Sequence, residues 1–186
     1  MEVLEKMAEI NVLFLVPARD FRDEEYAEPR KILEEAGYNI KVASSTVRNI
    51  RGRFGLELTP DIQVEAIKHE GFDAIILVGG PGAQEYFRNI IAHQIVTDFY
   101  NAGKIVAAIC IAPSTLANAG LLKGKKATAY ATELMTLKNQ GAIVSPKVVP
   151  VEVSGSIVTA NGPDASKEFG EAILKLLKEK TEAPQE

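Results

Sequence analysis

Three segments of the sequence are continuous runs of β-branched and aliphatic residues, each bounded by residues typical of turns. They are residues 10–16, 74–78 and 104–109. None of them alternates apolar with polar residues, which is the pattern of a strand buried on both faces. Such strands need helices on each side of the sheet, so the three runs predict an α/β fold with a mostly parallel sheet.

Stretches with apolar residues at helical spacing lie between and after these runs. The expected helices span residues 25–36, 90–102, 113–119 and about 164–178. The first three are each followed by a glycine, which is a common helix stop. Near the C-terminus, residues 148–153 and 156–159 flank Ser154-Gly155 and predict a β-hairpin.

The length of 186 residues suits one domain. We expect it to span residues 10–180, after an N-terminal extension at 1–9 and before a frayed tail at 181–186. Residues 51–58 interrupt the strand–helix rhythm and resemble a small inserted hairpin. It is either a plain surface hairpin or one that overhangs a site, in which case Phe54 would line the pocket.

Composition excludes several function classes. The formal net charge is −4 and the pI is near 5.4, with no run of Lys or Arg, which argues against a nucleic-acid partner. No apolar run is long enough to span a membrane, and the N-terminus lacks the apolar core of a secretory signal. A single cysteine permits no internal disulfide and no cysteine-based metal cluster, so a reducing, cytoplasmic setting is expected.

The single cysteine, Cys110, lies between the third apolar run and the helix expected from Pro113. Small residues around it leave room for the sharp turn of a nucleophile elbow. A helix N-terminus behind the sulfur would lower the pKa of the thiol, so we expect a reactive thiolate. The alternative is an inert buried thiol, because free cysteine is among the most buried residue types.

A second candidate feature is the glycine pair Gly79 and Gly80, which follows the apolar run at 74–78. Ligands of open α/β sheets bind at the carboxyl ends of the strands. Backbone N–H groups of Gly80 and of Cys110 or Ile111 could there form an oxyanion hole. The alternative is a tight turn that serves only helix packing.

A third feature is the acidic segment Asp23-Glu24-Glu25, which follows the first apolar run. Asp23 and Glu24 are explained by the favourable effect of acidic residues at a helix N-terminus. Glu25 could instead point over the sheet toward Cys110.

Together these residues resemble the ThiJ/PfpI superfamily over about residues 10–178. The motifs that carry the resemblance are Val12-Leu13-Phe14-Leu15, Glu25 with Pro29 four residues later, Val78-Gly79-Gly80, Ala108-Ile109-Cys110 and Asn161-Gly162-Pro163. The resemblance implies a flavodoxin-like, doubly wound sheet in a three-layer sandwich. It also implies that Glu25 shares a hydrogen bond with the Cys110 thiol and that Gly80 supplies an oxyanion-binding N–H. It suggests no metal or organic cofactor, and self-association into a dimer or larger homo-oligomer.

The sequence departs from the superfamily pattern in its histidines. The protease-like branch has a histidine directly after the cysteine, where this chain has Ile111. The deglycase-like branch has a histidine on a following strand, and alignment of residues 126–130 with that strand places Tyr130 at this position. We expect His69 and His93 to lie on solvated faces, out of reach of Cys110. The missing imidazole argues against efficient peptide hydrolysis.

The leading hypothesis is a stress-response protein that acts on small reactive carbonyls, as glyoxalases and deglycases do. Cys110 would add to the aldehyde, Glu25 would carry the proton, and the N–H groups of Gly80 and Ile111 would hold the oxyanion. Two like charges would repel, so we expect Glu25 to be protonated when Cys110 is ionised. The alternatives are a redox sensor or chaperone-like protein that uses Cys110 oxidation, and an intracellular peptidase or amidase with peptide substrates, which Ile111 disfavours. Tyr130, Gly79 and Phe54 are the expected pocket residues.

Overall fold

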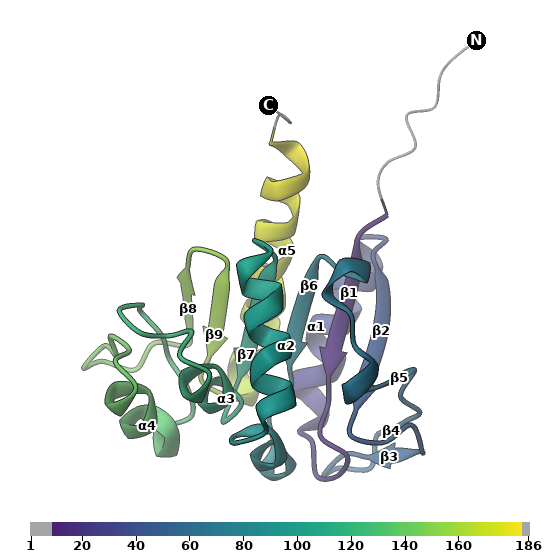
Figure 1. The fold of residues 1–186 in the computed structure, drawn as a ribbon, viewed down its shortest axis with the longest axis horizontal. Helices are drawn as coiled ribbons and strands as arrows, with labels where there is room; N and C mark the ends of the chain where they lie inside the picture. Colours follow the sequence, from purple (N-terminus) through teal and green to yellow (C-terminus); the bar gives the residue numbers. More distant parts are fainter. Residues whose placement is uncertain (1–8, 184–186) are drawn as a thin grey trace.

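The structure is a computed structural model that describes residues 9–183. Its main feature is a seven-stranded sheet, ordered β5-β2-β1-β6-β7-β9-β8 (Figure 1). In that order the strands span Ile62–Gln63, Asn39–Ser44, Asn11–Leu15, Ala74–Leu77, Ile105–Ile109, Ile157–Ala160 and Val151–Ser154. Every neighbouring pair is parallel except β8 and β9, which form the hairpin predicted around Ser154-Gly155. The mostly parallel sheet is confirmed.

The three apolar runs form the centre of the sheet as β1, β6 and β7. Every residue of β6 and β7 is buried. In β1, Val12 and Phe14 pack into the core on one face, while Leu13 and Leu15 pack into the core on the other. Both faces of these strands therefore demand apolar residues, which explains why the runs do not alternate.

Helices cover both faces of the sheet. The α-helices of the described residues are α1 (Asp23–Glu35), α2 (Ile90–Asn101), α3 (Pro113–Asn118), α4 (Leu134–Asn139) and α5 (Ser166–Glu182). Helices α1 and α5 pack against each other on one face, and α2 and α3 lie on the other (Figure 1). The flavodoxin-like, three-layer sandwich is confirmed.

Helices α1 and α5 approach each other closely at one glycine. A Cβ added at Gly170 of α5 would lie 2.9 Å from the Cα of Pro29 and 2.9 Å from the Cδ1 of Ile32 in α1. Any larger residue at this position would push α1 away from α5. Since α1 also carries Glu25, this contact helps to set the position of that carboxyl group.

Short elements complete the fold. The 3₁₀ helices are η1 (Val64–Ala66), η2 (His69–Gly71), η3 (Pro81–Tyr86), η4 (Ala131–Glu133) and η5 (Pro163–Ala165). Strands β3 (Ile50–Arg51) and β4 (Glu57–Leu58) form a separate antiparallel hairpin, as predicted for residues 51–58. The alignment led us to expect a strand at residues 126–130, and this expectation is wrong. The segment forms only an isolated bridge between Lys126 and Ile143.

Some expected boundaries also move. Helix α1 begins at Asp23, two residues earlier than predicted, and α5 continues to Glu182, beyond the predicted end near residue 178. The first two residues of the expected frayed tail are therefore helical. Residues 1–8 of the expected extension and residues 184–186 of the tail lie outside the described residues. Within residues 9–183, no helix has both the length and the apolar character needed to cross a bilayer.

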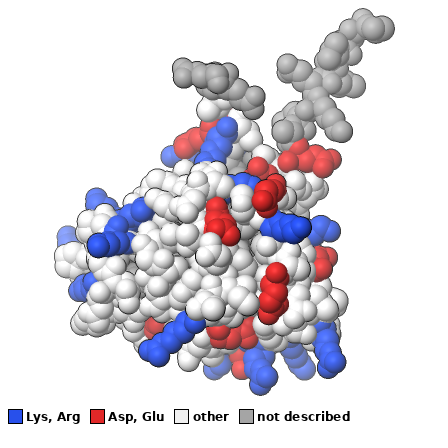
Figure 2. Space-filling model, in the orientation of Figure 1, with Lys and Arg blue, Asp and Glu red and all other residues white. Residues whose placement is uncertain are grey.

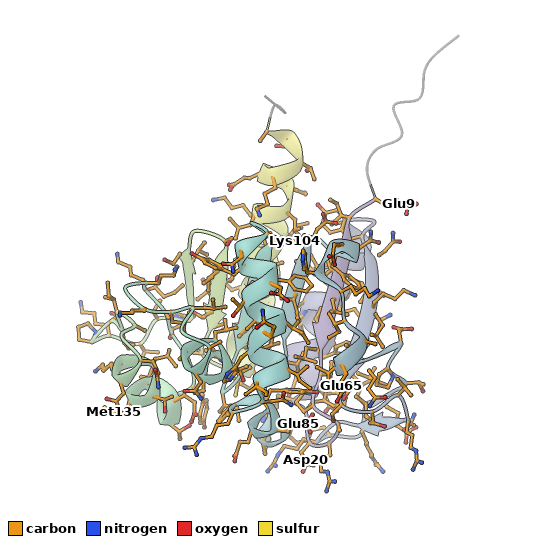
Figure 3. The ribbon with its side chains drawn as sticks, viewed as in Figure 1. Glu9, Asp20, Glu65, Glu85, Lys104 and Met135 are labelled. Carbon is orange, nitrogen blue, oxygen red and sulfur yellow. The ribbon has the colours of Figure 1, made fainter. Side chains whose placement is uncertain are left out.

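The carboxyl ends of the parallel strands form the lower edge of the molecule in Figure 1, next to the β3–β4 hairpin. Figure 3 marks this edge by Asp20, which follows β1, and by Glu85, which follows β6. Lys104, which precedes β7, marks the opposite edge. Ligands of open α/β sheets bind at the carboxyl edge, so the site is expected there.

Candidate active site

Cys110 lies at the sharp turn between β7 and α3, at the carboxyl edge. Its φ of 64° is in the left-handed region, which among the described non-glycine residues is shared only with Asp20. Such a conformation costs on the order of 1–3 kcal/mol and persists only when its surroundings hold it. The Cys110 N–H donates to the carbonyl oxygen of Ala160 at 2.9 Å, and the Cys110 carbonyl accepts from the N–H of Tyr130 at 2.8 Å. The backbone is thus held on both sides of the sulfur.

Gly79 brings Glu25 and Cys110 to the same place. A Cβ added at Gly79 would lie 2.4 Å from the Glu25 Oε2 and 2.6 Å from the Cys110 Cβ. The Gly79 N–H donates to the same Oε2 at 3.0 Å. Only glycine leaves space for the carboxyl and the cysteine side chain to meet, which explains this residue type after β6.

The Glu25 carboxyl is fully buried. Its Oε1 has no hydrogen-bond partner among the described residues. Burial raises the pKa of Glu25 from 4.5 to about 7, because the charged form loses its hydration. The Cys110 thiol, which lies beside the carboxyl, and the Gly79 N–H oppose part of this rise. The carboxyl is therefore about half ionised at neutral pH.

The Cys110 thiol behaves differently from our prediction. Its residue is only 8% exposed, and burial together with the Glu25 charge raises the pKa of Cys110 to about 12. Backbone N–H groups of Gly80 and Ile111 favour the thiolate but do not overcome these two effects. The predicted low thiol pKa is wrong, because tertiary burial outweighs the N-terminus of a six-residue helix. At neutral pH the proton is therefore on sulfur, while the Glu25 carboxyl is about half ionised.

Gly80 fits tightly under the loop between β1 and α1. Its φ is 93°, and a Cβ there would lie 2.5 Å from the Arg22 nitrogen and 2.5 Å from the Asp20 carbonyl oxygen. The structure therefore brings four expected site residues together, with the Gly80 and Ile111 N–H groups beside the sulfur of Cys110 and the Glu25 carboxyl next to it.

Sequence reasoning missed the residues that hold the β3–β4 hairpin next to this site. The Asp23 carboxylate accepts the N–H groups of Phe54 at 3.2 Å and Leu56 at 3.0 Å. The Arg22 guanidinium carbon lies 4.7 Å from the centroid of the Phe54 ring. Asp23 is thus more than a favourable charge at the start of α1. These contacts join residues about 30 positions apart, which leaves no local signal in the sequence.

Tyr130 adjoins the site through its backbone N–H, and its side chain is 47% exposed. The side chain lines an adjacent cavity of about 320 Å³. Asn161 and Gly162 of the C-terminal motif line the same cavity. Phe54, 63% exposed, lies in the hairpin against the Arg22 guanidinium and does not line this cavity.

The two histidines are half-buried rather than solvated, so that expectation is corrected. His93 lies in α2, with its Nε2 2.8 Å from the Phe87 carbonyl oxygen. His69 lies in η2 before β6, at the amino edge of the sheet, against the ring of Phe99. Among the described residues, no group of three or more His, Cys, Asp or Glu side chains has the arrangement of a metal site.

The DJ-1/PfpI family matches residues 10–176 of this sequence. The chain belongs to the DJ-1/PfpI family. Deglycase PfpI of Pyrococcus furiosus is 31% identical over 91% of this chain and 100% of its own length. General stress protein 18 of Bacillus subtilis is 33% identical over 84% of this chain and 92% of its own length.

The fold agrees with this assignment. The crystal structure of a ThiJ/PfpI domain protein from Brachyspira murdochii superposes with a TM-score of 0.88. That protein is 32% identical, and the match covers 92% of this chain and 98% of the other. The present DJ-1/PfpI chain thus shares its fold along nearly the whole domain, with Ile111 directly after the cysteine at the turn.

Proposed function

We propose that this protein acts on small reactive carbonyl compounds, as a glyoxalase or deglycase does, through Cys110 and Glu25. The observation that carries the proposal is a fully buried carboxyl group with a pKa near 7 beside the only cysteine of the chain. A general base is most effective when its pKa is near the pH at which it works. The relative from Pyrococcus furiosus is named a deglycase, which supports the same class of chemistry.

The chemistry begins with a protonated thiol and an ionised carboxylate. As the sulfur forms its bond to the aldehyde carbon, the thiol proton passes to Glu25 and the carbonyl electron pair moves onto oxygen. The N–H groups of Gly80 and Ile111, beside the sulfur, stabilise that charge until Glu25 returns the proton to the oxygen. The product of this step is a hemithioacetal, and no proton is gained or lost.

A 2-oxoaldehyde can then react further without an outside oxidant. Glu25 removes the proton from the former aldehyde carbon and returns a proton to the neighbouring ketone carbon, through an enediol. The first carbon is thereby oxidised to a thioester and the second is reduced to an alcohol. Water cleaves the thioester, which releases a 2-hydroxy acid and restores the Cys110 thiol.

Two alternatives have weaker support. Oxidation of cysteine proceeds from the thiolate, so a thiol with a pKa near 12 makes a slow redox sensor. Peptide hydrolysis needs an acid for the amine leaving group, and Ile111 occupies the position where an imidazole would be expected.

The expected homo-oligomer stays a prediction, which sedimentation equilibrium of the purified protein would test.

The test is a comparison of methylglyoxal consumption and lactate formation by wild type, Cys110→Ser and Glu25→Gln. Both variants should lose most of the activity, by about 10²-fold or more for Glu25→Gln, as expected for loss of a general base. Lys41→Gln, an exposed change on β2, is the control and should retain the wild-type rate. Lactate formation that survives in Cys110→Ser would refute the proposal.

A further inference from the structure

Arginine is unevenly distributed in this chain. Five of the seven arginines lie in two short segments, residues 19–22 and 48–53, and neither segment contains lysine. The structure joins these segments: Arg19 and Arg51 form a β-bridge, and the Arg53 N–H donates to the Phe21 carbonyl at 2.9 Å. In a chain with net charge −4, basic side chains thus gather at the carboxyl edge near the hairpin, which is the lower right of Figure 2.

Arg22 is the member of this group that is fixed next to the reacting residues. Its N–H donates to the Gly79 carbonyl at 3.0 Å, so its backbone lies directly on the glycine turn. Its guanidinium stacks over the Phe54 ring, and its side chain is only 30% exposed. Asp23 holds the backbone of Phe54, so the cation is held at the hairpin. It is close enough to Glu25 and Cys110 for their charges to raise the pKa of Arg22.

Glu24 occupies only part of the Arg22 guanidinium. The Nε and Nη2 groups donate to the two oxygens of Glu24 at 2.8 and 3.3 Å. Nη1 has no acceptor among the described residues. The electrostatic effect of Arg22 on the Glu25 carboxyl, which lowers its pKa, exceeds the opposing effect of Glu24. At the Glu25 carboxyl, the positive charge of Arg22 therefore outweighs the negative charge of Glu24.

We propose that Arg22 recognises the substrate, and that the preferred substrates are 2-oxoaldehydes with a carboxylate at the far end. This inference rests on the proposed function. A guanidinium binds a carboxylate through paired N–H donors. One partly occupied guanidinium suits a single negative charge, whereas a phosphate dianion would meet the carboxylates of Asp23, Glu24 and Glu25. The exposed arginines Arg51 and Arg53 attract the anion from a distance.

A suitable probe is 4,5-dioxopentanoate, which carries an aldehyde next to a ketone, with two methylene groups between the ketone and a terminal carboxylate. Its conversion adds one water, oxidises the aldehyde carbon to an acid and reduces the ketone carbon to an alcohol, so the product is 2-hydroxyglutarate. The balance needs no other reactant. Its methyl ester has the same reacting atoms without the charge and is the matched neutral substrate.

The first experiment compares kcat/KM for the acid and the ester in wild type, Arg22→Gln, Arg22→Lys and Arg88→Gln. Wild type should prefer the acid by about tenfold or more, the gain from a charge-assisted hydrogen bond. Arg22→Gln should lose this preference through a higher KM, with the ester within about twofold of wild type. Arg22→Lys should recover part of it, and the exposed Arg88→Gln should match wild type. An equal loss on both substrates would overturn the proposal.

The second experiment needs no turnover, so it separates this inference from the proposed function. Calorimetric titration of the acid and the ester into Cys110→Ser measures binding alone. The acid should bind at least about tenfold more tightly than the ester, and Arg22→Gln in the same background should abolish the difference. Equal binding of acid and ester would refute recognition by Arg22, even if wild type consumes both. Tight binding of the acid without turnover in wild type would support Arg22 and refute the proposed function.

Discussion

The Asp23 carboxylate accepts the backbone N–H of Leu56 at 3.0 Å, and this contact ties the first turn of α1 to the β3–β4 hairpin. The same carboxylate accepts the N–H of Phe54. Glu25 lies two residues further along the same helix turn. The hairpin and the buried carboxyl are therefore held by adjacent parts of one element, and a change at Asp23 should affect both.

We expect Asp23→Ala to loosen the hairpin. It leaves two backbone N–H groups without their charged acceptor, so stability should fall by about 1–3 kcal/mol. Amide hydrogen exchange at Phe54 and Leu56 should accelerate. Glu24→Ala is the control, since Glu24 bonds only to the Arg22 side chain and accepts no hairpin N–H. Unchanged exchange at both amides in Asp23→Ala would contradict the role of the carboxylate.

We expect Gly79→Ala to disrupt the site. The added Cβ would collide with the Glu25 Oε2 and the Cys110 Cβ, and neither can move freely in the core. Urea denaturation should show a loss of about 1–3 kcal/mol, typical of overpacking, together with lost carbonyl turnover. Gly71→Ala is the matched control, because nothing lies within 4 Å of its added Cβ. If Gly79→Ala and Gly71→Ala have the same stability and the same turnover, the close contacts at Gly79 are not needed for the site.

The pH dependence of turnover should report Glu25. Because the carboxylate must accept the thiol proton, kcat/KM for methylglyoxal should rise with pH through a midpoint near the Glu25 pKa of about 7. Glu25→Gln should be slow at every pH and lack this limb. A wild-type profile that is flat between pH 5 and 9 would exclude Glu25 as the base.

Stability should depend on pH in the opposite direction. The folded-state pKa of Glu25 is raised from 4.5 to about 7, so the folded protein binds this proton more tightly than the unfolded chain. The contribution is complete below pH 4.5 and is lost as pH rises through 7, by on the order of 3 kcal/mol. Denaturation of wild type and Glu25→Gln at pH 5 and pH 8 measures it. Wild type should lose more stability than Glu25→Gln, and equal losses would refute the raised pKa.

The sequence was most informative where one segment determines its own structure. The buried strands β1, β6 and β7 are apolar on both faces, and the glycine pair after β6 and the cysteine after β7 follow directly from them. Because parallel strands end at one edge, residues that follow them were expected to meet. The order of motifs along the chain then added Glu25 to this group.

The sequence failed where distant contacts decide. The alignment with the superfamily placed residues 126–130 on a strand, but the Thr128 N–H donates to the Thr159 side chain instead of pairing with a strand backbone. The direction of the Cys110 pKa depends on how deeply the thiol is buried and on a carboxylate 85 positions away in the chain. Neither can be read from the residues next to the cysteine.

Cys110 is the only cysteine of the chain and is 8% exposed. Chemical labelling of its thiol can therefore measure local opening of the structure around the turn. In the closed state a thiol with a raised pKa reacts slowly, whereas any opening that frees the turn from Ala160 and Tyr130 exposes an ordinary cysteine. The rate at which a neutral alkylating reagent labels the protein at pH 8 therefore reports how often β9 and the segment before η4 separate from the turn. One mass-spectrometric time course would measure that local opening without any engineered label.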